Sequence, residues 1–178
     1  ATTRYDGSSR FSPRHRGGLF PSVSAAWRMN MEDWMQGLNW LSHLKPRVSY
    51  GQLGNQGTNL YPFATTVNRD TWAFGKGTVS TASIGRPSDL TLSWETKATL
   101  NTGLDIGLFN NRLTASFDWF YDRTKDIIGT PTVPTTFGAG SPIQNTYVID
   151  NKGWEFEFRW TSQIKNFKYF IGGNIFDS

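Results

Sequence analysis

Residues Trp154-Glu-Phe-Glu-Phe-Arg-Trp160 alternate strictly between large aromatic side chains at even positions and charged side chains at odd positions. Successive side chains on a β-strand point to opposite faces of the sheet, so this segment has one aromatic face and one charged face. In a soluble sheet the aromatic face would be core. In a membrane barrel it would face lipid, and the charges would face a water-filled lumen.

The same alternation recurs along the chain and favours membrane strands. Apolar residues occupy most even positions from Ala98 to Leu108 and the odd positions from Leu113 to Tyr121. Shorter runs of the same kind lie at residues 23–29 and 167–175. A transmembrane strand needs about 9 to 11 residues, against about 5 to 6 for a soluble strand. Several runs reach the membrane length, so we predict an all-β fold of antiparallel transmembrane strands.

The alternation assigns side chains to the two faces of this predicted wall. The candidate lipid-facing residues are Trp27, Leu104, Phe117, Trp119, Trp154, Phe156, Phe158 and Trp160. The candidate lumen-facing residues are Asn101, Asp105, Asp118, Glu155, Glu157 and Arg159. A slip of one residue would put Arg159 into lipid, at about 2–4 kcal/mol near the midplane, so the register is strongly specified.

Composition excludes several classes of protein. No stretch approaches about 20 consecutive apolar residues, which excludes a helical membrane protein. The mean hydropathy of -0.47 suits a barrel, in which half of each strand is polar. The 18 Lys and Arg residues are scattered, so we expect no nucleic-acid partner. An aromatic content of 15% also suits a soluble glycan-binding β-domain, which stays open as an alternative.

Patterns that suggest enzyme chemistry each have a simpler explanation. The glycines of the segment Gly51–Gly57 lack the strand-to-helix context of a nucleotide site. Glu155 and Glu157 could be a glycosidase pair, but Arg159 continues their face as a ladder of solvated charges. The two histidines have no partner at metal-ligand or triad spacing, and there is no cysteine. We therefore predict that the chain is not an enzyme, and we expect no cofactor or metal.

Connections alternate between short and long. Phe109–Arg112 and Gln163–Asn166 are tight turns, whereas Asp6–Gly18, Asn55–Ser93 and Gly129–Asp150 are long and polar. Short turns at one end and long loops at the other are typical of outer-membrane barrels, in which the short turns are periplasmic.

One connection departs from that alternation. The segment Asn30–Leu44 is long but lies where a short turn is due. Its apolar residues Trp34, Leu38 and Leu41 recur at helical spacing after an acidic pair that suits a helix N-terminus. We predict a short amphipathic helix at the periplasmic rim.

Several segments together resemble a known family, the TonB-dependent outer-membrane transporters of the SusC/RagA type. The similar segments occur in family order across almost the whole chain. They are Arg4-Tyr-Asp-Gly-Ser-Ser-Arg-Phe11, Gly18-Leu-Phe-Pro-Ser-Val-Ser-Ala-Ala-Trp-Arg28, Leu44-Lys-Pro-Arg-Val-Ser-Tyr-Gly-Gln-Leu-Gly-Asn-Gln56, Trp94-Glu-Thr96, Gly103-Leu-Asp-Ile-Gly-Leu-Phe109, Phe117-Asp-Trp-Phe-Tyr-Asp122 and Asn151-Lys-Gly-Trp-Glu155.

The resemblance implies a barrel of about 22 strands that is closed by a plug. Such transporters import glycans or peptides across the outer membrane of Bacteroidetes-type bacteria, with energy from TonB and beneath a SusD-like surface lipoprotein. Residues 1–178 would be a partial barrel domain, while the plug domain and TonB box are expected outside this chain. The expected partners are the lipoprotein, the TonB complex through those N-terminal parts, outer-membrane lipid, and a glycan or peptide substrate. A passive porin is the other alternative.

The number of crossings predicts an open sheet. The alternating segments make about seven crossings, which leaves the first and last strands running in the same direction. Closing that ring would require a parallel pair, whereas single-chain bacterial barrels pair antiparallel. We therefore expect an open sheet that needs further strands at both edges, because unpaired backbone groups in lipid cost several kcal/mol each.

Overall fold

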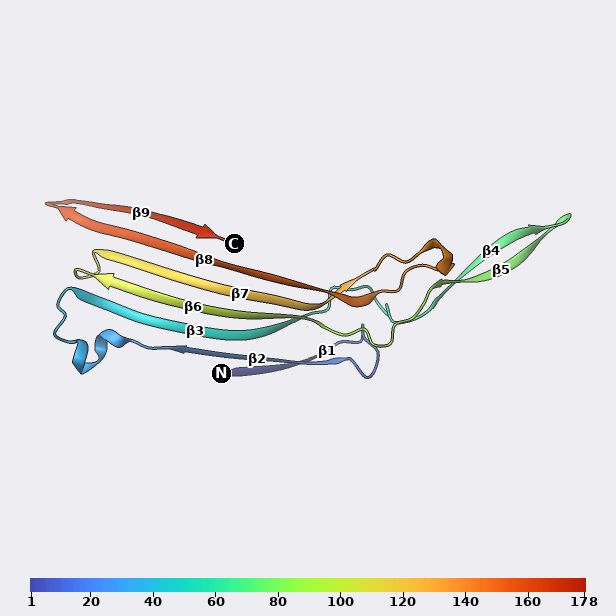
Figure 1. Ribbon diagram of the computed structural model, residues 1–178, viewed down its shortest axis with the longest axis horizontal. Coiled ribbons are helices and arrows are strands. Elements are labelled where there is room, and N and C mark those ends of the chain that lie inside the picture. Colours follow the sequence, from blue (N-terminus) through green and yellow to red (C-terminus); the bar gives the residue numbers. More distant parts are fainter.

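The computed structural model describes residues 1–178 as an extended antiparallel sheet with a separate hairpin at one end (Figure 1). No helix in it is long and apolar enough to cross a membrane. The strands of the sheet are β1 (Thr2–Gly7), β2 (Gly17–Ala26), β3 (Leu41–Asn55), β6 (Glu95–Leu108), β7 (Leu113–Gly129), β8 (Gln144–Ile164) and β9 (Phe167–Asp177). The hairpin consists of β4 (Thr66–Phe74) and β5 (Gly77–Arg86).

The sheet is open and has the predicted number of strands. Its order is β1-β2-β3-β6-β7-β8-β9, and every neighbouring pair is antiparallel. The strands β1 and β9 lie at opposite edges and do not pair, which confirms the predicted partial barrel. Only 10 of the 178 residues are buried, so no second layer covers either face of the sheet.

The register brings the alternating residues into continuous rows across the sheet. Phe156 lies opposite Phe117, which lies opposite Leu104, and the neighbouring row joins Glu155 to Asp118. Directly opposed side chains on antiparallel strands share a face. The aromatic residues Trp154–Trp160 of β8 therefore lie on one face with Phe117 and Trp119 of β7, and Glu155 lies on the other face with Asp118.

The two tight turns lie at one end of the sheet and three longer connections lie at the other, while the long β2–β3 connection departs from this division (Figure 1). The tight turns β6–β7 and β8–β9 lie at one end with the β2–β3 connection, and we call this the turn end. The long connections β1–β2, β3–β6 and β7–β8 lie at the other, which we call the loop end. The predicted loop Asn55–Ser93 contains the hairpin β4–β5, and β8 begins inside the predicted loop Gly129–Asp150.

The predicted amphipathic helix at Asn30–Leu44 is wrong. The segment forms two short 3₁₀ helices, η1 (Met29–Met31) and η2 (Asp33–Met35), and β3 begins at Leu41. Isolated helices shorter than about 12 residues are marginal, and pairing with β6 draws the end of the segment into the sheet. The side chain of Asn30 closes the connection, because its amide donates to the carbonyl of Ser42 at 3.1 Å.

The principal buried cluster lies at the loop end rather than between layers. Phe11, Phe20, Leu92 and Trp94 form it, and we call these four residues the collar core. The ring of Trp94 lies 5.4 Å from that of Phe11 and 5.5 Å from that of Phe20. Since Phe11 comes from the β1–β2 connection and Leu92 from the β3–β6 connection, the collar core joins two loops to the wall.

Candidate functional site

An arginine-centred ion network spans three strands on the charged face. Arg47 on β3 donates to Asp118 on β7 at 2.6 Å and to Asp105 on β6 at 3.4 Å. Lys45 lies 3.8 Å from the other oxygen of Asp105. An arginine shared between two carboxylates holds both of them in fixed positions through charge-assisted hydrogen bonds. The network ties β3, β6 and β7 together on one face of the wall.

Gly103 makes room for this network. It lies between Arg47 and Asp118 in the same cross-strand row. A Cβ atom at this position would lie 2.6 Å from the guanidinium carbon of Arg47 and 2.8 Å from a carboxylate oxygen of Asp118. Arg47 and Lys45 were not among the predicted lumen-facing residues. Their odd positions on β3, which Ser49 continues, could have identified them from the sequence.

Substitution of Gly103 by valine should destabilise the barrel by about 1–3 kcal/mol, because the new side chain displaces Arg47 from the two aspartates. Arg47→Met should cost a similar amount, because it leaves Asp118 without a cation and Asp105 with Lys45 alone. The double variant should cost about as much as one single variant, since each removes the same network. The urea unfolding midpoints of the full-length barrel in lipid measure the loss of stability in the two single variants and the double variant. Additive losses would contradict a shared network.

The other predicted lumen-facing residues lie on the same face as Arg47. Asn101 lies opposite Ser49, and Glu157 lies opposite Ser116. The guanidinium of Arg159 lies over the ring of Phe170, 5.3 Å from its centre, as a cation–π contact. Glu155 and Glu157 form no ion pair, so they are free to meet cationic or polar groups.

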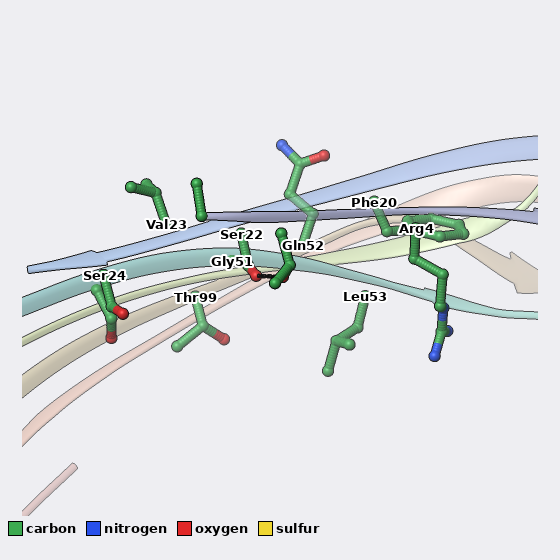
Figure 2. A pocket seen from close by; sticks show the side chains of 12 residues that line it. Arg4, Phe20, Ser22, Val23, Ser24, Gly51, Gln52, Leu53 and Thr99 are labelled. Atoms are coloured by element: carbon green, nitrogen blue, oxygen red, sulfur yellow. Dashed lines mark hydrogen bonds between the residues drawn. The ribbon is translucent and has the colours of Figure 1, made fainter.

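Several hollows lie on this polar face, among them the following two. The first, of about 360 Å³, is lined by His43, Asp105, Glu157 and Arg159 among others toward the turn end. The second, of about 580 Å³, lies beside β1, β2 and β3. Figure 2 shows that its side chains include the hydroxyls of Ser22 and Thr99 and the guanidinium of Arg4. Hydroxyl and guanidinium groups can exchange hydrogen bonds with a polar solute that passes along the wall.

The opposite face carries every candidate lipid-facing residue. The rings of Phe117 and Trp154 stack with their centres 6.4 Å apart, and those of Phe156 and Phe158 stack at 6.3 Å. Trp27 continues this face past the end of β2, where its backbone N–H donates to the carbonyl of Pro46 at 3.0 Å. An uncovered apolar face of this extent marks contact with an apolar medium or partner. The assignment of this face to lipid remains a prediction.

Hydrogen bonds fix the loop end around the collar core. The indole N–H of Trp94 donates to the carbonyl of Arg16 at 3.0 Å. The hydroxyl of Ser12 donates to the carbonyl of Leu90 at 2.7 Å. Asn145 bonds both the N–H and the carbonyl of Ser93, at 2.8 and 3.0 Å. The β1–β2 and β3–β6 connections are therefore joined to each other, and the β3–β6 connection is joined to the start of β8.

Comparison with known protein families identifies the family of this chain. The family model described as TonB dependent receptor-like, beta-barrel matches residues 1–177. The chain belongs to this family. TonB-dependent receptors are β-barrel proteins of the outer membrane, so the soluble glycan-binding alternative is set aside.

Individual relatives are consistent with the family. The chain is 34% identical over 167 residues to TonB-dependent receptor P26 of Formosa agariphila, covering 93% of the chain and 17% of that protein. It is 34% identical over 184 residues to TonB-dependent receptor SusC of Bacteroides thetaiotaomicron, covering 98% of the chain and 18% of SusC. The chain thus spans less than a fifth of the length of these relatives.

Solved structures of the RagAB peptide importer share the fold. The chain matches the state titled closed-closed with a TM-score of 0.82 and the state titled open-open with 0.83, at 30% identity. Each match covers 98% of the chain and 19% of the solved chain. The two TM-scores differ by only 0.01, so the matched section does not distinguish the two states.

Surface labelling should separate the two ends of the sheet in this receptor. A cysteine in place of Lys76, in the turn of the β4–β5 hairpin, should react with a membrane-impermeant maleimide on intact cells. A cysteine in place of Asn166, in the β8–β9 turn, should react only after the outer membrane is opened, because short turns of such barrels are periplasmic. Labelling of residue 166 alone on intact cells would invert the topology.

Proposed function

We propose that this chain is a wall section of a SusC-like TonB-dependent transporter that imports glycans or peptides together with a SusD-like lipoprotein. The observation that carries the proposal is the register of the open sheet, which separates a continuous aromatic face from a continuous charged face. Within a family of outer-membrane receptors, those faces suit lipid and a wet lumen.

The charged face supports transport rather than catalysis. Its ion network, free glutamates and hydroxyl-lined hollow offer many weak polar contacts along the strands instead of one enclosed site. A permeation path needs contacts that are favourable enough for entry and weak enough for exit. This arrangement suits a polar solute such as an oligosaccharide or peptide.

The lipoprotein partner and the energy source are carried over from relatives. The solved neighbours are structures of RagAB, a peptide importer, and one relative is SusC. By analogy, this transporter works with a SusD- or RagB-like surface lipoprotein and depends on TonB. Parts of the full-length protein beyond residues 1–178 would contact TonB.

Uptake by intact cells tests the proposal. Deletion of the full-length gene should abolish uptake of fluorescently labelled oligosaccharides or of labelled peptides, and the class that is lost identifies the substrate. A protonophore should abolish the same uptake in wild-type cells, because TonB transmits energy from the proton gradient. Uptake that persists with the protonophore would favour the passive porin. Unchanged uptake of both classes in the deletion strain would overturn the import function.

A further inference from the structure

The β4–β5 hairpin reaches farther from the sheet than any other part of the chain, past the β7–β8 connection (Figure 1). It projects past the loop end, and every residue of β4 is exposed. A two-residue turn at Gly75 and Lys76 closes it, and Gly75 has the positive φ of 59° that such turns favour in their first central residue. An isolated two-stranded ribbon is marginally stable in water, so this hairpin is expected to contact something outside the section.

The end of the hairpin is apolar on one face only. Trp72 lies opposite Val79, and Phe74 lies two residues along β4 on the same face. We call these three residues the tip patch. Trp72 and Phe74 are 64% and 68% exposed. The reverse face at the same height carries small side chains, Thr71 opposite Ser80 and Ala73 opposite Thr78. An exposed tryptophan and phenylalanine gathered on one face is a pattern typical of a protein–protein contact.

The base of the hairpin is fixed although its tip is free. The N–H of Gly140, in the β7–β8 connection, donates to the carbonyl of Gly85 at 2.7 Å. On the segments that lead into and out of the hairpin, the guanidinium of Arg10 bonds the carbonyl of Thr58, and Ser12 bonds Leu90. Both bonds come from the loop that holds Phe11 in the collar core. A fixed base presents the tip patch at a defined position.

We propose that the tip patch is a docking point for a protein partner that offers an apolar surface bordered by carboxylates. The charge of the hairpin supports this chemistry, because Arg69, Lys76 and Arg86 outnumber the single acidic residue Asp70. This proposal rests on the proposed function, in which the partner is the surface lipoprotein.

The reach of the hairpin argues against lipid as the occupant. At about 3.3 Å per residue, the nine residues of β4 carry the tip about 30 Å beyond its base. The base already lies past the loop ends of the wall strands, whereas the apolar face runs alongside β8. The tip patch is therefore far from the apolar band along the strand direction, at the level where a lipoprotein on the cell surface would lie.

Photo-crosslinking in the full-length transporter identifies the occupant. Benzoylphenylalanine is placed at Trp72 or, as the matched control, at Thr71 on the reverse face, in cells that also produce the lipoprotein. We expect a crosslink from position 72 to a lipid-anchored protein, identified by mass spectrometry, that is at least about tenfold stronger than from position 71. Crosslinks from position 72 to another loop of the transporter, to a second copy, to lipid only or to nothing would overturn the proposal.

Charge substitution provides a second measurement. The pair Trp72→Glu and Phe74→Glu should lower co-purification of the lipoprotein by at least about tenfold, while Thr71→Glu with Thr78→Glu should leave it unchanged. Heat-dependent gel mobility checks that each barrel is folded. Unchanged co-purification with the tip variant would overturn the docking point alone. Failure of the wild-type transporter to bind any lipoprotein would instead overturn the partner in the proposed function.

Discussion

Replacement of Phe156 by arginine should lower the stability of the full-length barrel in a phospholipid bilayer by about 2–4 kcal/mol. Phe156 lies on β8 halfway between Trp160 and Lys152, opposite Phe117 and Ile175. Its row is therefore near the middle of the apolar face, where a cation loses most of its hydration. The loss of contact with Phe117 and Phe158 adds to the cost. The urea midpoint of heat-modifiable gel mobility measures the change.

The adjacent residue on the same strand is the matched control. Glu157→Arg introduces the same side chain one position along β8, opposite Ser116 and Asn174 on the charged face. We expect a change below about 1 kcal/mol, because an arginine there stays in water and lies near Asp105. If Glu157→Arg were the more damaging of the two substitutions, the faces assigned to lipid and lumen would have to be exchanged.

The wall strands could be predicted from sequence because period-two alternation is a local property. The alternating segment Trp154–Trp160 lies within β8, and the expected open sheet of about seven strands is confirmed. The hairpin β4–β5 was missed because apolar residues gather at its tip instead of alternating along it. The turn signal Gly75-Lys-Gly77 was present and could have identified it.

Features that depend on contacts between distant segments could not be predicted from the sequence. Burial of Phe11 requires Leu92, which lies in another loop, and no periodicity relates them. The Arg47 network needed the register of three strands, because its partners lie on β6 and β7. The helix expected at Asn30–Leu44 failed for a related reason: local spacing favoured it, but pairing of β3 with β6 took its last residues. Tertiary pairing overrides weak local preference.

Truncation of Phe11 to alanine should open the loop end to protease. Phe11 is fully buried against Trp94, and such a truncation costs about 3–5 kcal/mol. Most of this loss of stability would fall on the β1–β2 connection, since the wall strands keep their backbone hydrogen bonds to one another. Three trypsin sites, Arg10, Arg14 and Arg16, lie in this connection. Where cleavage follows the open population, its rate on intact cells should rise at least about a hundredfold.

An exposed phenylalanine at the same end of the molecule is the control for this prediction. Phe137 in η3 (Thr135–Phe137) is about half exposed and lies outside the collar core, so Phe137→Ala should leave cleavage at Arg10, Arg14 and Arg16 unchanged. Heat-modifiable gel mobility reports whether the barrel is folded in both variants. We expect Phe11→Ala to keep the folded band, because the hydrogen bonds of the seven-stranded sheet do not depend on the loops. Equal resistance of Phe11→Ala and wild type would mean that the hydrogen bonds from Ser12 and Trp94 hold the connection without the buried ring. Cleavage accompanied by loss of the folded band would instead mean that the collar core stabilises the wall itself.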